Sequence, residues 1–153
     1  MSIPKSVVKF KKGDIVYTSS VDRVQYTMRE LTRAALRDVG KFVARTCNSA
    51  AMKLQGMKRS RRVRGKTSAF QYWVRKKEGD LQVGIKHGTW YGEQQELGTR
   101  NQPKRGFLRT SVYDNIPTIV EIESKYLSAL ESEAEALRLI ESEDEYTGGG
   151  DDD

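Results

Sequence analysis

Residues 90–109 read WYGEQQELGTRNQPKRGFLR, and we expect the rest of the chain to be organised around this stretch. Thr89, just before it, is suited to the N-cap of a short helix, and Gly98 supplies the left-handed residue at which such a helix ends. Pro103 disfavours helical geometry in the residue before it. The pattern therefore predicts a short helix followed by a loop over residues 99–104.

An apolar pair follows this loop. Phe107 and Leu108 are suited to anchoring it in the core before the next helix begins. With both ends fixed in this way, Glu96, Arg105 and Arg109 would lie on a defined surface. Such a surface is better suited to docking another chain than to catalysis.

Upstream of this stretch, two short runs alternate between apolar and polar residues. The runs are residues 70–75 and 81–86, and the turn between them contains Gly79, which can adopt positive φ. They predict a β-hairpin. Trp73 falls on the face opposite Phe70, where it would either anchor an interface or pack under a helix.

A long amphipathic helix is predicted before the hairpin. Ser20 and Asp22 are suited to its N-terminus, and Gly56 to its end. Gly40 lies inside it and indicates either a close contact or a bend. The apolar positions repeat every three or four residues and predict one buried stripe, formed by Val24, Met28, Leu31, Ala35, Val39, Phe42 and Thr46.

A second long amphipathic run follows the stretch. Pro117 is suited to a first helical turn, unless a helix already begins at Phe107, in which case Pro117 would kink it. One apolar face is predicted, formed by Val120, Leu127, Leu130, Ala134 and Leu137 and widened near its start by Ile119, Ile122 and Tyr126.

The fold class that these patterns predict is α+β, with two long amphipathic helices packed on a small antiparallel β-sheet. We expect an N-terminal arm over residues 1–20 with two short β-like runs, which would pair within the chain or with a neighbour's sheet. A single domain over residues 21–140 and an acidic C-terminal tail over residues 141–153 would follow.

The net charge of +6 conceals an asymmetry between the two halves of the chain. Residues 1–76 hold 19 Lys and Arg against 4 Asp and Glu, whereas residues 77–153 hold 8 against 17. The halves therefore carry net charges of +15 and −9. Opposite charges of this kind orient association more than they drive it.

The densest basic run is residues 57–66. It contains no acidic residue, and its basic side chains are Lys58, Arg59, Arg61, Arg62, Arg64 and Lys66. Such a run repels itself unless an anionic partner neutralises it. It would dock on an acidic protein face, bind nucleic-acid phosphates, or remain a solvated loop.

Several classes of function lack their sequence signals. There is no glycine-rich phosphate loop, no nucleophile elbow and no paired-cysteine metal spacing. The lone Cys47 is interpreted as a buried structural thiol, and the lone His87 makes a poor metal site. No apolar run is long enough to cross a membrane, and no secretory signal is apparent. We therefore expect neither an enzyme nor a protein with a cofactor or metal.

The same stretch resembles a known family. Nine of its residues resemble the signature of the neck or tail-completion proteins of tailed bacteriophages: Tyr91, Glu96, Gly98, Thr99, Pro103, Arg105, Phe107, Leu108 and Arg109. The chain departs from that signature at Gln94, Gln95, Gly106 and Thr110. The resemblance covers about twenty residues.

The resemblance implies a structural virion protein of the head-tail connector, assembled in the bacterial host cytoplasm. It implies a homo-oligomeric ring, a hexamer, that joins the DNA-filled head to the tail. Its neighbours would be the head-closure or adaptor connector proteins and the tail terminator or tail tube protein. Double-stranded DNA would pass through the lumen without sequence-specific contact. The alternatives are a tail-terminator ring and a nucleic-acid-binding module that uses residues 57–66.

Overall fold

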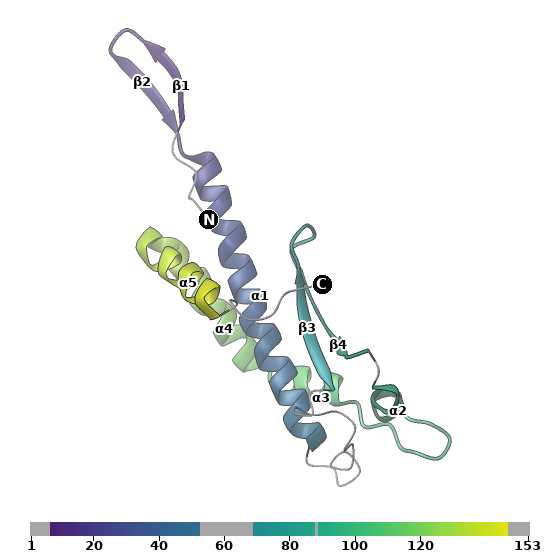
Figure 1. Cartoon of the computed structure of the whole chain (residues 1–153). Helices are drawn as coiled ribbons and strands as arrows, with labels where there is room; N and C mark the ends of the chain where they lie inside the picture. The colour runs from purple at the N-terminus through teal and green to yellow at the C-terminus, as the bar shows by residue number, and fades with distance from the viewer. Residues whose placement is uncertain (1–6, 53–68, 88, 147–153) are drawn as a thin grey trace. The chain divides into compact units, whose positions relative to one another are not determined.

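The computed structural model describes residues 7–52, 69–87 and 89–146 (Figure 1). The elements are β1 (Val7–Lys12), β2 (Ile15–Ser19), α1 (Val21–Met52), β3 (Phe70–Arg75), β4 (Asp80–Ile85), α2 (Trp90–Leu97), α3 (Phe107–Tyr113), α4 (Ile116–Ser128), the 3-10 turn η2 (Ala129–Glu131) and α5 (Glu133–Tyr146). The α+β class predicted from the sequence is confirmed. The strands form two separate antiparallel pairs, β1–β2 and β3–β4.

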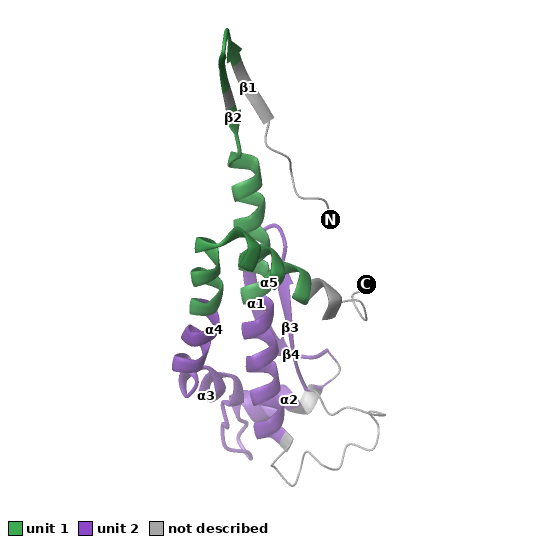
Figure 2. Cartoon of the chain, turned by 90° about the vertical axis from the view of Figure 1, so that its left-hand side faces the viewer, with its two compact units in different colours: residues 1–35, 124–153 green, residues 36–123 purple. Residues whose placement is uncertain are grey.

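The chain divides into two compact units (Figure 2). Unit 1 comprises residues 1–35 and 124–153, and unit 2 comprises residues 36–123. Helices α1 and α4 each contribute residues to both units. The division into arm, domain and tail expected from the sequence stays a prediction, although α5 continues past Ile140 to Tyr146.

The core of unit 2 lies where the second half of α1 packs on the β3–β4 hairpin. Its buried residues include Val39, Val43 and Cys47 of α1, with Phe70 at the start of β3. In the same unit a Cβ added to Gly40 would lie 2.5 Å from Tyr72 Cδ2. Gly40 therefore marks a close contact between the helix and the hairpin, one of the two alternatives predicted for it.

The hairpin forms as the sequence predicts. Arg75 pairs with Asp80 across its end, and Gly79 in the turn has a φ of 67°. Arg75 Nε donates to Asp80 Oδ1 at 2.7 Å, and this partner lowers the pKa of the Asp80 carboxyl. The face carrying Tyr72 is turned toward α1, whereas Trp73 on the other face is 43% exposed.

The predicted apolar stripe of α1 is wrong at its N-terminal end. Leu31 is buried, as predicted, but Val24 and Met28 are about half exposed. Helical spacing identifies a face but does not specify how far along the helix a partner covers that face. An apolar surface is consequently left open on α1 in unit 1.

The second amphipathic run is divided rather than continuous. Helix α4 begins at Ile116, with Pro117 in its first turn, and the helical path is interrupted where Ser132 is extended, with φ −129° and ψ 113°. The predicted apolar face is wrong at Leu127 and Leu130, which are exposed, but right at Tyr126, which is buried, and at Ile119 and Ile122, which pack against the core. Among the described helices, none is long and apolar enough to cross a membrane.

Candidate docking surface

Helix α2 brings residues 90–109 against the hairpin of unit 2. Gly92 of α2 is buried, and a Cβ added to it would lie 3.0 Å from Ile85 Cγ2 of β4. The absence of a side chain at Gly92 therefore permits close packing. Thr89 precedes the helix as predicted, but its hydroxyl donates to the Lys86 carbonyl instead of capping α2.

The loop after α2 is closed by hydrogen bonds between its two sides. The amide of Arg105 donates to the Gln95 carbonyl at 3.0 Å, and that of Gly106 to the Glu96 carbonyl at 3.3 Å. At the tip, Thr99 and Gln102 exchange two backbone hydrogen bonds of 2.9 and 3.2 Å. We call residues 96–109 the signature corner. These bonds fix the path of its backbone.

Gly98 is required where the loop doubles back. Its φ is 79° and its ψ is 162°, a region that residues with a side chain rarely occupy. A Cβ at this position would lie 2.8 Å from the backbone nitrogen of Lys104. The sequence predicted positive φ here, and the structure confirms it. The close approach of Lys104 is a second reason for glycine that the sequence did not reveal.

Glu96 has a structural role that sequence reasoning missed. Both of its carboxylate oxygens lie 3.2 Å from the backbone nitrogen of Leu108, whose amide donates to them. Helix α3 begins at Phe107, and the residue before it, Gly106, has no side chain with which to cap it. Glu96, which lies twelve residues before Leu108 in the chain, caps the helix instead. Its negative charge lies at the positive end of the helix.

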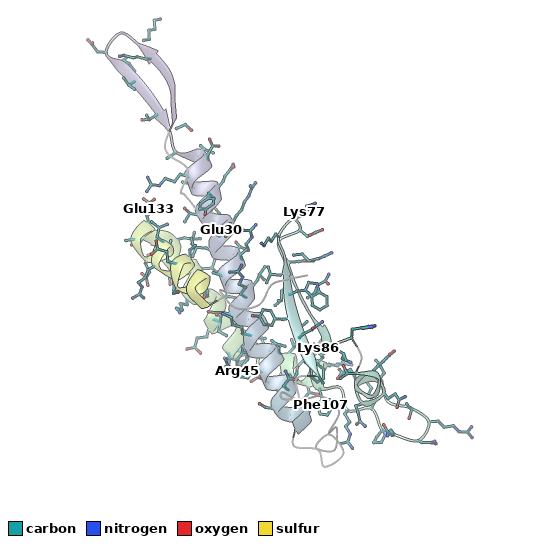
Figure 3. All side chains as sticks on the ribbon, in the orientation of Figure 1. Glu30, Arg45, Lys77, Lys86, Phe107 and Glu133 are labelled. Atoms are coloured by element: carbon teal, nitrogen blue, oxygen red, sulfur yellow. The ribbon has the colours of Figure 1, made fainter. Side chains whose placement is uncertain are left out.

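Phe107 anchors the signature corner in the core of unit 2, as predicted. Phe107 is labelled in Figure 3. Its ring meets Phe70 edge to face, with centroids 6.3 Å apart and planes at 74°. Its carbonyl lies 3.8 Å from the Sγ of Cys47, which is fully buried. Burial raises the pKa of the Cys47 thiol, and a hydrogen bond with Ser111 lowers it to a smaller extent.

Asn48, a second residue that sequence reasoning missed, connects helix α1 to this anchor. Its side-chain amide donates to the Phe70 carbonyl at 3.1 Å and accepts from the Phe70 amide at 3.0 Å. One side chain thus satisfies both backbone groups of the first residue of β3. An asparagine inside a helix carries no signal in the sequence that would identify this pairing.

The outer side of the signature corner is basic. Arg105 and Arg109 are exposed, as are Arg100, Pro103 and Lys104. Residues 97–113 contain no acidic side chain. The Arg109 guanidinium lies 5.5 Å from the centroid of the Tyr113 ring, in a cation–π arrangement. The corner therefore presents fixed positive charge on a rigid backbone.

The basic residues 57–66 and the side chain of Tyr91, which the sequence also predicted as site residues, lie outside the described residues. His87 is exposed, and in the described part of the chain no three His, Cys, Asp or Glu side chains gather as a metal site would require. The ring of Trp73 lies over Gly84, where an added Cβ would be 3.8 Å from it.

Comparisons with protein-family models, with curated proteins and with solved structures find no match for this chain.

Proposed function

We propose that this chain is a structural protein of the head-tail connector of a tailed bacteriophage, in the neck or tail-completion layer. The proposal rests on the resemblance of residues 91–109, and the observation that carries it is the construction of the signature corner. Gly98, Glu96 and Phe107, three residues of the resemblance, fix its backbone. Arg105 and Arg109, two others, are left exposed. A backbone fixed by three residues, with two arginines exposed on it, makes a preformed docking surface.

A ring of identical subunits fits this arrangement. Closed cyclic symmetry requires two different patches on each subunit, and the chain offers a basic signature corner in unit 2 and an acidic surface on α5 in unit 1. Glu133, Glu135 and Glu141 of α5 are exposed. The proposed neighbours are the head-closure or adaptor proteins on one side and the tail terminator or tail tube on the other. DNA would pass through the lumen without sequence-specific contact.

The first experiment removes the protein from the assembling phage. Virions made without it are expected to give DNA-filled heads beside unattached tails in electron micrographs. Purified wild-type particles should contain the protein. Absence of the protein from those particles would contradict the proposal. A tail-terminator ring, the nearest alternative, predicts the same micrographs and differs in the neighbours that the protein contacts.

A second experiment tests the signature corner itself. The double variant Arg105→Glu and Arg109→Glu reverses two exposed charges, so we expect it to fold and to lose most head-tail joining. Lys77→Glu, an exposed charge reversal in the β3–β4 turn, is the matched control and should join heads to tails normally. Joining by the double variant at the wild-type level would show that the corner is not the docking surface.

Nucleic-acid binding is a second candidate, and the exposed Arg100, Lys104, Arg105 and Arg109 favour it. It predicts affinity for duplex DNA that falls steeply with salt, because each neutralised phosphate releases counterions. Binding titrations of the wild-type chain and of the double variant at several salt concentrations measure this. Equal, salt-independent affinities would exclude phosphate binding by the corner.

A further inference from the structure

Each unit of this chain exposes apolar side chains. Unit 1 has a groove of about 380 Å³, whose apolar lining residues are Val24 and Met28 of α1, Leu130 of η2 and Ala136 of α5, and whose polar ones include Arg23 and Glu133. Unit 2 has an apolar ridge, which we define as Val112, Tyr113 and Ile116. We propose that the ridge of one copy docks in the groove of a second copy, so that copies associate head to tail. This inference rests on the ring that the proposed function requires, and it names the interface between its subunits.

The groove is lined by both apolar and polar side chains. Val24, Met28 and Leu130 are 52%, 49% and 44% exposed, so water contacts a large part of each. Thr27, between them, is buried and its hydroxyl is bonded to the Arg23 carbonyl at 3.0 Å. The hydrocarbon that Val24, Met28 and Leu130 expose favours association, because a partner would remove it from water.

An ion pair lies at the edge of the groove. Arg23 bonds to Glu133 of α5, whose side chain remains 53% exposed. Within the described residues the Arg23 Nε is buried and has no hydrogen-bond acceptor. Glu133 thus has room to accept from a second cation. The groove favours a partner that brings apolar side chains and positive charge together.

The ridge of unit 2 has exposed apolar side chains and the positive charge of Arg109 beside it, together with the exposed acidic Asp114. Tyr113 is 63% exposed, Ile116 45% and Val112 38%, whereas Ser111 on the inner side of α3 is buried. Arg109, one turn before Tyr113, lies over its ring. Tyrosine and arginine are both enriched among the residues that contribute most to binding in protein interfaces.

Charge decides which surfaces pair. Two ridges packed on each other would bring together two copies of Arg109, and two grooves would bring together two copies of Glu133. Ridge on groove places Arg109 of one copy near Glu133 of the other, and Tyr113 against Met28 and Leu130. Because the two patches differ, the contact is heterologous, the type of contact that produces rings. A second copy of this chain is therefore the occupant that fits the groove.

Analytical ultracentrifugation measures how much the ridge contributes to self-association. Tyr113→Ser should weaken self-association at least about tenfold, and Tyr113→Phe should retain most of it, because the aromatic area supplies the contact. Leu127→Ser is the matched control, since Leu127 is 65% exposed but lies outside the ridge, the groove and the signature corner. Equal weakening by Leu127→Ser and Tyr113→Ser would overturn the inference, as would a wild-type chain that stays monomeric at every concentration.

Disulfide trapping tests the pairing of the two surfaces. Tyr113→Cys and Met28→Cys are prepared as separate proteins and mixed under mild oxidation. A mixed dimer is expected from this pair and not from Leu127→Cys with Met28→Cys. The buried Cys47 remains in all variants as a common background.

The outcomes separate this inference from the proposed function. One outcome is that rings form normally while no disulfide links the Tyr113→Cys and Met28→Cys variants. That result would overturn the ridge-and-groove contact and leave the neck proposal standing. Specific disulfides in a protein that is absent from purified virions would do the reverse.

Discussion

Gly40 shows how a single missing side chain positions the hairpin of unit 2. The sequence predicted either a contact or a bend at this helical glycine, and could not decide between them. The deciding information is the path of residues far along the chain, since the ring of Tyr72 and the methyl of Leu81 occupy the space where a Cβ would stand.

Gly40→Ala should therefore destabilise the fold although alanine is the better helix former. The added methyl would lie 2.8 Å from Leu81 Cδ1 and 2.5 Å from Tyr72 Cδ2. Overpacking costs about 1–3 kcal/mol, which outweighs a helical gain of about 1 kcal/mol. We expect a net loss of roughly 1 kcal/mol in urea unfolding. Gly84→Ala, with its nearest neighbour at 3.8 Å, is the control and should cost less.

Glu96→Ala should weaken the start of α3. It removes the acceptor of the Leu108 amide, and loss of an N-terminal cap costs about 0.5–2 kcal/mol. Glu93→Ala, an exposed change on the same short helix, should change the free energy of unfolding little. A result in which both variants unfold at the same urea concentration as wild type would show that the carboxylate is not needed as a cap.

Cys47 should react slowly with thiol reagents in the folded protein. The side chain is fully buried, and burial raises the pKa of the thiol, so that little thiolate is present at pH 8. Ser49→Cys places a thiol on an exposed position of the same helix and should label within minutes, about a hundredfold or more faster. Comparable labelling of the two thiols would indicate that α1 opens readily near Cys47.

The raised pKa also has a consequence for stability. Above the ordinary thiol pKa of about 8.5, the unfolded chain loses this proton while the folded chain keeps it. The contribution of Cys47 is therefore present at lower pH and declines as the pH rises toward the folded value. In urea unfolding between pH 7 and 10, Cys47→Ala should show a shallower decline than wild type.

At the scale of elements, the sequence predicted the positions of helices and strands well. It predicted less well which face of each helix is buried. The β3–β4 hairpin, the short α2 helix and the turn at Gly98 follow from local rules about alternation, capping and φ, and they are present in the structure. The covered face of the second amphipathic run is a tertiary property. Apolar residues occur on two sides of this run, so that periodicity alone could not distinguish Leu127, which is exposed, from Tyr126, which is buried.

The two hairpins should differ in stability although each has only two strands. One face of β3–β4 is packed in the core of unit 2, whereas in β2 Ile15 and Val16 are 70% and 51% exposed. A two-stranded hairpin without a packed face is marginal in water. Hydrogen exchange of the monomer should therefore be at least about tenfold faster in β1–β2 than in β3–β4. Equal protection would show that the arm is covered by another part of the protein.

At the scale of the whole molecule, the two units share helices. Helix α1 passes from unit 1 into unit 2 after Ala35, and α4 passes back after Glu123. Melting one unit would fray helices that the other needs, so we expect one cooperative transition. Tryptophan fluorescence, which reports unit 2 alone because both Trp73 and Trp90 lie there, should coincide with helical circular dichroism in urea. Two separated transitions would show that the units unfold independently.

The hydrogen-bonded sides of the signature corner also determine where this chain tolerates extra length. The pairings of Gln95 with Arg105 and Glu96 with Gly106 fix the spacing below the tip. Beyond these pairings, Arg100 and Asn101 are exposed at the tip of the loop, where they link its two sides. An affinity tag or an epitope spliced between these two residues would extend outward from the protein. Natural insertions and deletions among relatives of this chain should cluster at that junction.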